Sequence, residues 1–222
     1  MTPTRRQYVL ADGSRVPGVT TIINGNLGWS REALLRWANA EGLEGRVYGE
    51  TAGEAKTVGS LCHAMVEAEI LGRPFEDDGV DPRLLVQAKV AYQGYGAWRE
   101  HTAAKLVATE VHLVSERYRY GGTIDALGVM PRGLALVDWK TSRGTHADHV
   151  IQLAAYAKLW EEVTACALTG GVHLCRFDKR TGAFADYWWP RDALFPAWRA
   201  FEYLLALHGE KGIVEALLHD GR

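Results

Sequence analysis

The chain has 222 residues, of which 47% are hydrophobic and 23% are charged, and its formal net charge is −2. This composition is typical of a globular protein, and we predict a single domain over residues 1–222. The charge excludes a globally basic surface, so binding to nucleic acid would need a local basic patch. Three cysteines without a Cys-x-x-Cys pair argue against a disulfide framework and against a zinc or four-cysteine iron–sulfur site.

No segment approaches the roughly 18 apolar residues of a membrane span. The first residues also lack the apolar stretch of a signal peptide. We therefore expect a cytoplasmic protein with reduced thiols and no membrane partner.

The first half of the chain is predicted to be mainly helical. A hairpin is expected over residues 7–17, because Ala-Asp-Gly-Ser in its middle favours a turn. Three helices follow, at 31–41 with Ser30 as N-cap, at 54–71, and at 82–103 with Asp81 and Pro82 as the cap and first position.

The second half predicts a sheet with helices around it. Strands are expected at 106–114, 117–129 and 134–140, a helix at 147–163, a second hairpin of strands 171–177 and 183–189, and closing helices at 191–207 and 210–218. This order predicts an α+β fold with a central mixed β-sheet flanked by helices. Within the domain we distinguish an N-terminal hairpin and helical part (1–53), a core (54–189) and C-terminal helices (190–222).

Two aspartates and a lysine on the expected central hairpin suggest chemistry. If Pro131 and Arg132 form the turn, Asp125 and Asp138 are equally far from it and face each other across the strands. Opposed residues lie about 4.5–5.5 Å apart at Cβ, and like charges there are destabilising. Lys140 is two residues beyond Asp138 and so shares its face. This grouping suits a divalent cation beside a scissile phosphate better than it suits a structural role.

Ordinary explanations exist for each of these residues taken alone. An isolated aspartate is most often a turn or edge-strand residue, and an isolated strand lysine often protects a sheet edge. Aspartate is depleted in strands, however, and the opposed pair costs free energy. The combination therefore favours a functional site.

The same residues carry a resemblance to a known family. Gly-Gly-Thr-Ile-Asp125, Val-Asp138-Trp-Lys140 and Gln152-Leu-Ala-Ala-Tyr156, preceded by His63 on a predicted helix, resemble the RecB-type branch of the PD-(D/E)-x-K nuclease superfamily. The match covers roughly residues 55–180. The first 50 residues are also similar to the opening of phage and mitochondrial single-chain exonucleases. The resemblance implies a restriction-endonuclease-like αβββαβ core.

The resemblance also implies roles at the metal. Asp125 and Asp138 would bind Mg²⁺ or Mn²⁺ through their carboxylate oxygens. The carbonyl of Trp139 and the imidazole of His63 would be further ligands, although a lone helical histidine is more often an ordinary surface or core residue. Lys140 would orient and help deprotonate the attacking water, or stabilise the charge on the phosphorane.

Other residues would complete the catalytic site and bind DNA. Glu110, on the first strand and on the face opposite its apolar residues, would lie near the metal. Gln152 and Tyr156, four apart on one helix, would contact DNA phosphate or order the lysine. Arg143 would contact the backbone, and Trp29 would stack on a single-stranded base. The plain alternatives are a polar helix face, a half-buried tyrosine and a solvated arginine.

The sequence thus predicts a metal-dependent DNA exonuclease of phage or bacterial recombination and repair, acting in a bacterial or phage-infected cell. The alternatives are a structure-specific or nicking endonuclease with the same site, and a catalytically inactive DNA-binding protein with a nuclease fold. The expected partner is DNA, single-stranded or at an end, with a single-strand-annealing or single-strand-binding protein as a candidate. Polarity, strand preference and oligomeric state, including a homo-oligomer, stay open.

Overall fold

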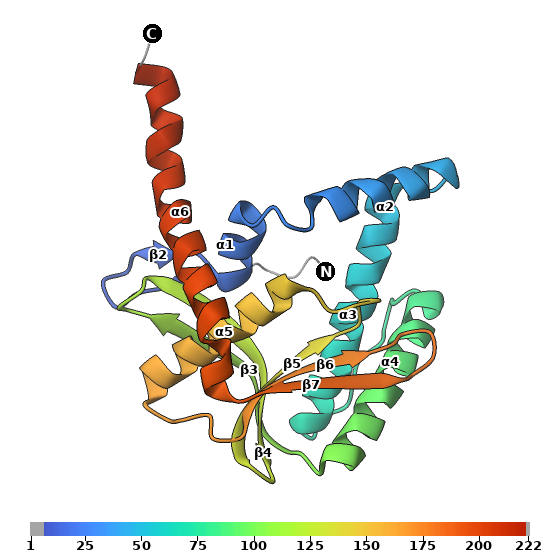
Figure 1. The fold of residues 1–222 in the computed structure, drawn as a ribbon. Helices are drawn as coiled ribbons and strands as arrows, with labels where there is room; N and C mark the ends of the chain where they lie inside the picture. The colour runs from blue at the N-terminus through green and yellow to red at the C-terminus, as the bar shows by residue number, and fades with distance from the viewer. Residues whose placement is uncertain (1–6, 221–222) are drawn as a thin grey trace.

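A mixed five-stranded sheet runs through the middle of the molecule, in the order β3-β4-β5-β6-β7 (Figure 1). The strands are β3 (Lys105–Ser115), β4 (Tyr120–Met130), β5 (Gly133–Lys140), β6 (Gly171–Phe177) and β7 (Phe184–Trp189). Only β5 and β6 are parallel, and the crossover between them contains α5 (Ala147–Thr164). This computed structural model describes residues 7–220, so residues 1–6 and 221–222 of the predicted domain lie outside the described part.

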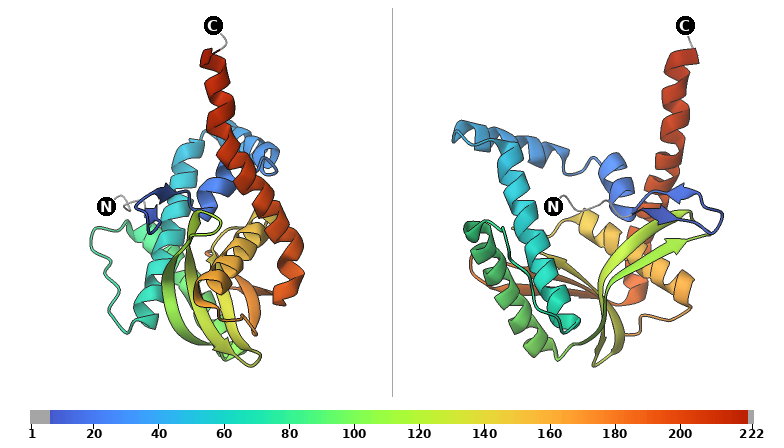
Figure 2. Two further views of the ribbon diagram at one scale, coloured as in Figure 1. Left: turned by 90° about the vertical axis from the view of Figure 1, so that its left-hand side faces the viewer. Right: turned by 180° about the vertical axis from the view of Figure 1, so that it is seen from behind.

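Helices cover both faces of the sheet (Figures 1 and 2). On one face α1 (Val19–Asn26), α5 and α6 (Phe195–Asp220) pack on residues such as Leu136 and Leu174. On the other face α3 (Tyr48–Ile70) and α4 (Pro82–Thr102) pack around Trp139 and Cys175. Because side chains alternate along a strand, each central strand supplies both cores. The predicted α+β fold is confirmed, and its element order is consistent with a restriction-endonuclease-like core.

Several predicted elements are confirmed with small changes of boundary. The N-terminal hairpin forms from β1 (Tyr8–Val9) and β2 (Arg15–Val16). Asp81 caps α4, since its carboxylate accepts a hydrogen bond from the Arg83 N–H at 2.8 Å. Between residues 7 and 220, none of the helices combines the length and the hydrophobicity needed to cross a bilayer.

One helix was not predicted, and two other local predictions were wrong. The β-branched run in α1 was not predicted as a helix, but burial of Val19, Ile22 and Ile23 overrides its low helix propensity. Helix α3 begins at Tyr48 and not at residue 54. Ser30 is the N-cap residue of α2 (Arg31–Leu43), as predicted, although its side chain makes no cap hydrogen bond.

The second wrong prediction concerns the C-terminus. The two predicted closing helices are one helix, α6, preceded by a short 3-10 turn (Arg191–Leu194). Gly209 does not end α6, because a glycine inside a helix costs only about 1 kcal/mol relative to alanine. The C-terminal half of α6 and the distal end of α2 both project from the body of the molecule (Figures 1 and 2).

Candidate metal and catalytic site

Three carboxylates lie in one row across adjacent strands. Glu110 on β3 lies between two residues that pair with the neighbours of Asp125 on β4, so the register places it opposite Asp125. Ala126 pairs with Val137, which puts Asp125 and Asp138 at the next opposed position of β4 and β5. The β4–β5 turn predicted from the sequence therefore sets the alignment of Asp125 with Asp138.

Strand β3 is irregular where it meets the row. Its register with β4 shifts between Leu106 and Ala108. Glu110 itself has φ +52°, in the left-handed region that non-glycine residues adopt infrequently. The side chain of Thr109 bonds to the Asp125 carbonyl at 2.9 Å. The simple alternation expected for this strand is thus interrupted, and backbone strain of this kind clusters at functional sites.

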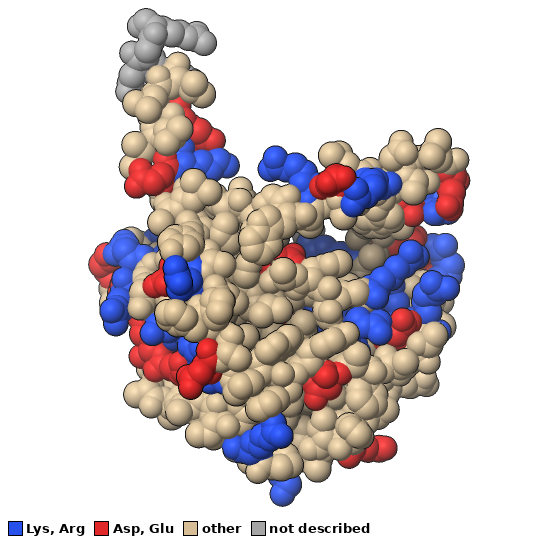
Figure 3. Space-filling view, viewed as in Figure 1, with Lys and Arg blue, Asp and Glu red and all other residues tan. Residues whose placement is uncertain are grey.

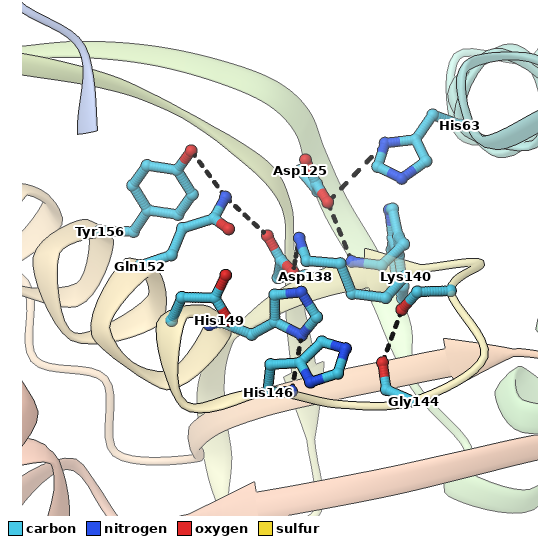
Figure 4. A network of polar contacts seen from close by, with 12 residues as sticks. His63, Asp125, Asp138, Lys140, Gly144, His146, His149, Gln152 and Tyr156 are labelled. Carbon is cyan, nitrogen blue, oxygen red and sulfur yellow. Dashed lines mark hydrogen bonds and ion pairs between the residues drawn. The ribbon is translucent and has the colours of Figure 1, made fainter. Parts of the chain in front are cut away.

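His63 joins the row from the other side. It lies on α3, and its Nδ1 is 3.8 Å from Oδ2 of Asp125 (Figure 4). One ligand atom from each of His63, Glu110 and Asp125 lies within 4.8 Å of the others. A cavity of about 310 Å³, lined by His63, Glu67 and Glu110 among others, adjoins this group. Carboxylate oxygens with an imidazole are a donor set for divalent metals.

Asp138 is engaged differently. Its carboxylate is fully buried and forms an ion pair with the Lys140 ammonium. The side-chain amide of Gln152 donates to Asp138 Oδ1 at 3.4 Å and to the hydroxyl of Tyr156 at 3.0 Å (Figure 4). Helix α5 therefore supplies Gln152, which bonds to Asp138 directly, and Tyr156, which bonds to Gln152. Among the described residues, Asp138 is not part of the three-residue donor group around Asp125.

Burial and neighbouring charges shift the ionisation of the site. Burial raises the pKa of Asp125, partly countered by His63 and reinforced by the charge of Asp138. The Trp139 backbone N–H donates to Asp125 Oδ2 at 2.9 Å. Burial lowers the pKa of Lys140, but the charges of the two aspartates outweigh it and the net shift is upward. Lys140 is therefore an ammonium at neutral pH.

Trp139 also has a structural role, which the sequence did not reveal beside the expected metal contact of its carbonyl. Its indole is buried and packs against Tyr95, Trp98 and Phe177 between the sheet and α4. This packing fixes the strand between Asp138 and Lys140. The predicted metal contact of its carbonyl stays a prediction.

Two histidines at the start of α5 border the site, and the sequence reading missed them. Figure 4 places His149 and His146 next to Asp138 and Lys140. The Nδ1 of His149 accepts a hydrogen bond from the His146 backbone N–H at 3.3 Å. Burial, together with the charge of Lys140, lowers the pKa of His149 to about 4, so it is neutral at pH 7. The His-x-x-His spacing at a predicted helix start is the sequence feature that could have indicated these two histidines.

The expected DNA contacts lie at the edges of the site. Arg143 is exposed on the loop after β5. It lies close enough to Lys179, in the β6–β7 turn, that its charge adds to burial in lowering the pKa of Lys179. Figure 3 shows Lys and Arg side chains gathered on the side of the molecule where α3 and α4 lie. The sequence reading did not single out Lys179.

Trp29 lies on the loop before α2 and is 67% exposed. It lines a cavity of about 570 Å³ together with Leu34, Trp37 and His146. His146 also borders the site, so this cavity lies next to the start of α5.

Comparisons with known proteins give structural neighbours only. No protein-family model matches the sequence, and no curated protein sequence matches it. A “putative exonuclease” structure from Eubacterium rectale is similar over 66% of this chain, with 14% identity and a TM-score of 0.45. The matched part spans 64% of that protein, less than two thirds of its length. LHK-Exo, solved in complex with dAMP, is similar over 73% of this chain and 84% of its own, with 12% identity and a TM-score of 0.39. These values are too low to assign the chain to a family.

Proposed function

We propose that this protein is a Mg²⁺- or Mn²⁺-dependent DNA exonuclease of the RecB type. The observation that carries the proposal is the row of Glu110, Asp125 and Asp138 across three strands, with His63 and Lys140 at the same end of the sheet. Opposed like charges destabilise a sheet. A bound cation and a phosphate substrate would offset that cost, whereas a purely structural role would not.

The donor set fits a divalent metal. His63, Glu110 and Asp125 are mutually close, and the raised pKa of Asp125 marks a carboxylate short of solvation. We propose these three as ligands, together with Asp138 and the carbonyl of Trp139. A bound Mg²⁺ or Mn²⁺ supplies activation of water and neutralisation of phosphate charge.

The chain's own residues would position the reaction. Asp138 holds the Lys140 ammonium at the site, where it can orient the attacking water and stabilise charge on the phosphorane. In-line attack on phosphorus would release the 3′-oxygen of the neighbouring nucleotide and leave a 5′-phosphate. Gln152 and Tyr156 would keep Asp138 in place, and their predicted contact with DNA phosphate belongs to the same proposal.

The surroundings support DNA as the substrate. Arg143 and Lys179 form a like-charged pair beside the site, suited to backbone phosphates. The exposed indole of Trp29 suits an unpaired base, which single strands and DNA ends offer, and this favours an exonuclease. A role in phage or bacterial recombination and repair, in the cytoplasm and beside a single-strand-annealing or single-strand-binding protein, completes the proposal.

Digestion of end-labelled DNA tests the proposal directly. Linear and circular, single- and double-stranded substrates are incubated with Mg²⁺, Mn²⁺ or EDTA. Wild type is compared with Asp138→Ala and Lys140→Ala. Lys89→Ala, at an exposed lysine of α4 that pairs with Asp77, is the matched control. Metal-dependent loss of linear DNA only, abolished by the first two changes and kept by the control, supports an exonuclease.

The other outcomes separate the alternatives. Cleavage of circles would establish an endonuclease. Binding of every substrate without cleavage would indicate an inactive DNA-binding protein, and calorimetry would then show no metal binding at the site.

A further inference from the structure

Helix α6 has two apolar faces, and only one is covered. Trp198, Phe201 and Leu204 point into the core. Tyr203 and Leu207 lie on the opposite side of the same helix and are exposed. A helix with one core-facing stripe would normally be polar on its other side.

The uncovered face continues along the C-terminal half of the helix. Tyr203, Leu207, Glu210, Val214 and Leu217 recur at spacings of four and three residues, which is the a/d pattern of a coiled coil. Six large side chains on or beside this line are each between 54% and 72% exposed: Tyr203, Leu207, Ile213, Val214, Leu217 and Leu218. Contiguous apolar surface of this kind marks an interaction site.

The position of this face excludes cover by the rest of the described chain. The C-terminal half of α6 projects beyond the body in all three views (Figures 1 and 2). A projecting helix end with so many exposed aliphatic residues would bury apolar surface, and so gain stability, by packing on a partner helix.

We propose that a second copy of this chain covers the face, by antiparallel pairing of the two α6 helices. In an antiparallel pair, a positions pack against d positions, so Leu207 lies opposite Leu217 and Glu210 lies opposite Val214. Lys211, which flanks the line and is more than half exposed, then lies about one turn from Glu210 of the second copy. In this arrangement Leu207 packs on Leu217, and Lys211 offsets the charge of Glu210 across the interface.

The alternative orientation is disfavoured by one residue. In a parallel pair Glu210 would face itself, and like charges in a helix interface are unfavourable. Antiparallel pairing also places the two bodies at opposite ends of the helix pair, with neither body beside the other.

Sedimentation of the full chain tests the dimer. Wild type is expected to sediment as a concentration-dependent dimer. Val214→Glu with Leu217→Glu is expected to weaken dimerisation by about 100-fold or more, because one new carboxylate would face Glu210 of the second copy and the other would be buried among leucines. Leu43→Glu, on the 82%-exposed leucine at the end of α2, is the matched control and should leave the dimer intact. Far-UV circular dichroism of all variants shows that they are folded. Since these residues lie away from the carboxylate row, the result is independent of whether the nuclease proposal holds.

Cysteine cross-linking tests the orientation. The exposed Cys166 is first replaced by serine, and Cys62 and Cys175 are buried. A mixture of Leu207→Cys and Leu217→Cys chains should form mixed disulfide dimers, while either variant alone should not. Cross-linking of Leu207→Cys with itself would overturn the antiparallel arrangement. A wild type that stays monomeric at every concentration would overturn the proposal.

Discussion

Asp125→Asn is expected to stabilise the metal-free protein while removing its activity. The pKa of Asp125 is raised chiefly by burial, with the charge of Asp138 adding to it. A carboxyl group whose pKa is raised on folding loses stability as the pH rises through that pKa, so at neutral pH the ionised group is a net cost. Asparagine keeps the shape of the side chain and removes the charge.

Two effects of the substitution on the free energy of unfolding oppose each other, and their sizes decide whether the variant is more or less stable than wild type. Losing the charge weakens the hydrogen bond from the Trp139 N–H, a loss of roughly 1 kcal/mol. Keeping a buried carboxylate ionised costs several kcal/mol, of which nearby charges and this hydrogen bond return part. We expect a net gain of about 1 kcal/mol for the variant in EDTA, or about 2–4 °C in Tm for a chain of this size.

Divalent metal should reverse the order of stability, so that wild type becomes more stable than the variant. At a metal concentration of about 100 times Kd, wild type gains about 2.7 kcal/mol, and a variant that has lost a ligand gains less. Thermal unfolding followed by circular dichroism in EDTA, Mg²⁺ and Mn²⁺ measures both differences. In EDTA the stability advantage of the variant should disappear as the pH falls below the ordinary aspartate pKa of about 4. The side chain at position 125 is then uncharged in both proteins.

A matched control and two results would refute the reasoning. Asp77→Asn, at a half-exposed aspartate in the loop before α4, should change stability by no more than about 0.5 kcal/mol. If Asp125→Asn unfolds at a lower temperature in EDTA, the carboxylate is a structural acceptor and its charge is compensated. If metal stabilises the variant as much as wild type, Asp125 is not a ligand.

Three further changes address the catalytic lysine, the packing behind the site and the pH response. Lys140→Ala should lower kcat about 10²–10³-fold, because it removes a group that stabilises developing charge, and single-turnover cleavage measures this. Gly122→Ala would place a Cβ 2.7 Å from a ring carbon of Tyr156, so urea unfolding should show a loss of about 1–3 kcal/mol and cleavage should slow. Glu41→Gln should lower Tm at pH 7, since the hydrogen bond from Arg46 holds the pKa of Glu41 at about 2. Because that pKa is lowered on folding, the stabilisation is present above the ordinary pKa and is lost as the pH falls towards 2, where thermal melts of the two proteins should coincide.

For each of these three predictions there is a result that would contradict it, and the glycine substitution also has a control variant. A loss confined to KM in Lys140→Ala would show that the ammonium only binds substrate. Gly96→Ala in α4, where a Cβ meets nothing within 4 Å, should stabilise the protein by about 0.5–1 kcal/mol, and equal behaviour of both glycine variants would mean that Tyr156 yields freely. A pH-independent Tm difference in Glu41→Gln would mean that the charge of this residue does not stabilise the fold.

Much of the fold and the centre of the site followed from local rules. The turn at Pro131 and Arg132 sets the register, and the register alone opposes Asp125 and Asp138. The four-residue spacing of Gln152 and Tyr156 puts them on one helix face, where they share a hydrogen bond. These relations depend on a few neighbouring residues, which is why the amino-acid sequence determined them.

The tertiary structure decided what depends on distant partners. Helix α1 forms because Val19 and its neighbours are buried against α5 and α6, against their own propensity. Glu110 enters the row through an irregular strand with a left-handed residue, which alternation does not predict. His149 borders Lys140, and Lys179 lies near Arg143, only because separate segments pack together. Sequence patterns report which residues share a strand or a helix face, whereas burial and long-range packing determine which faces meet.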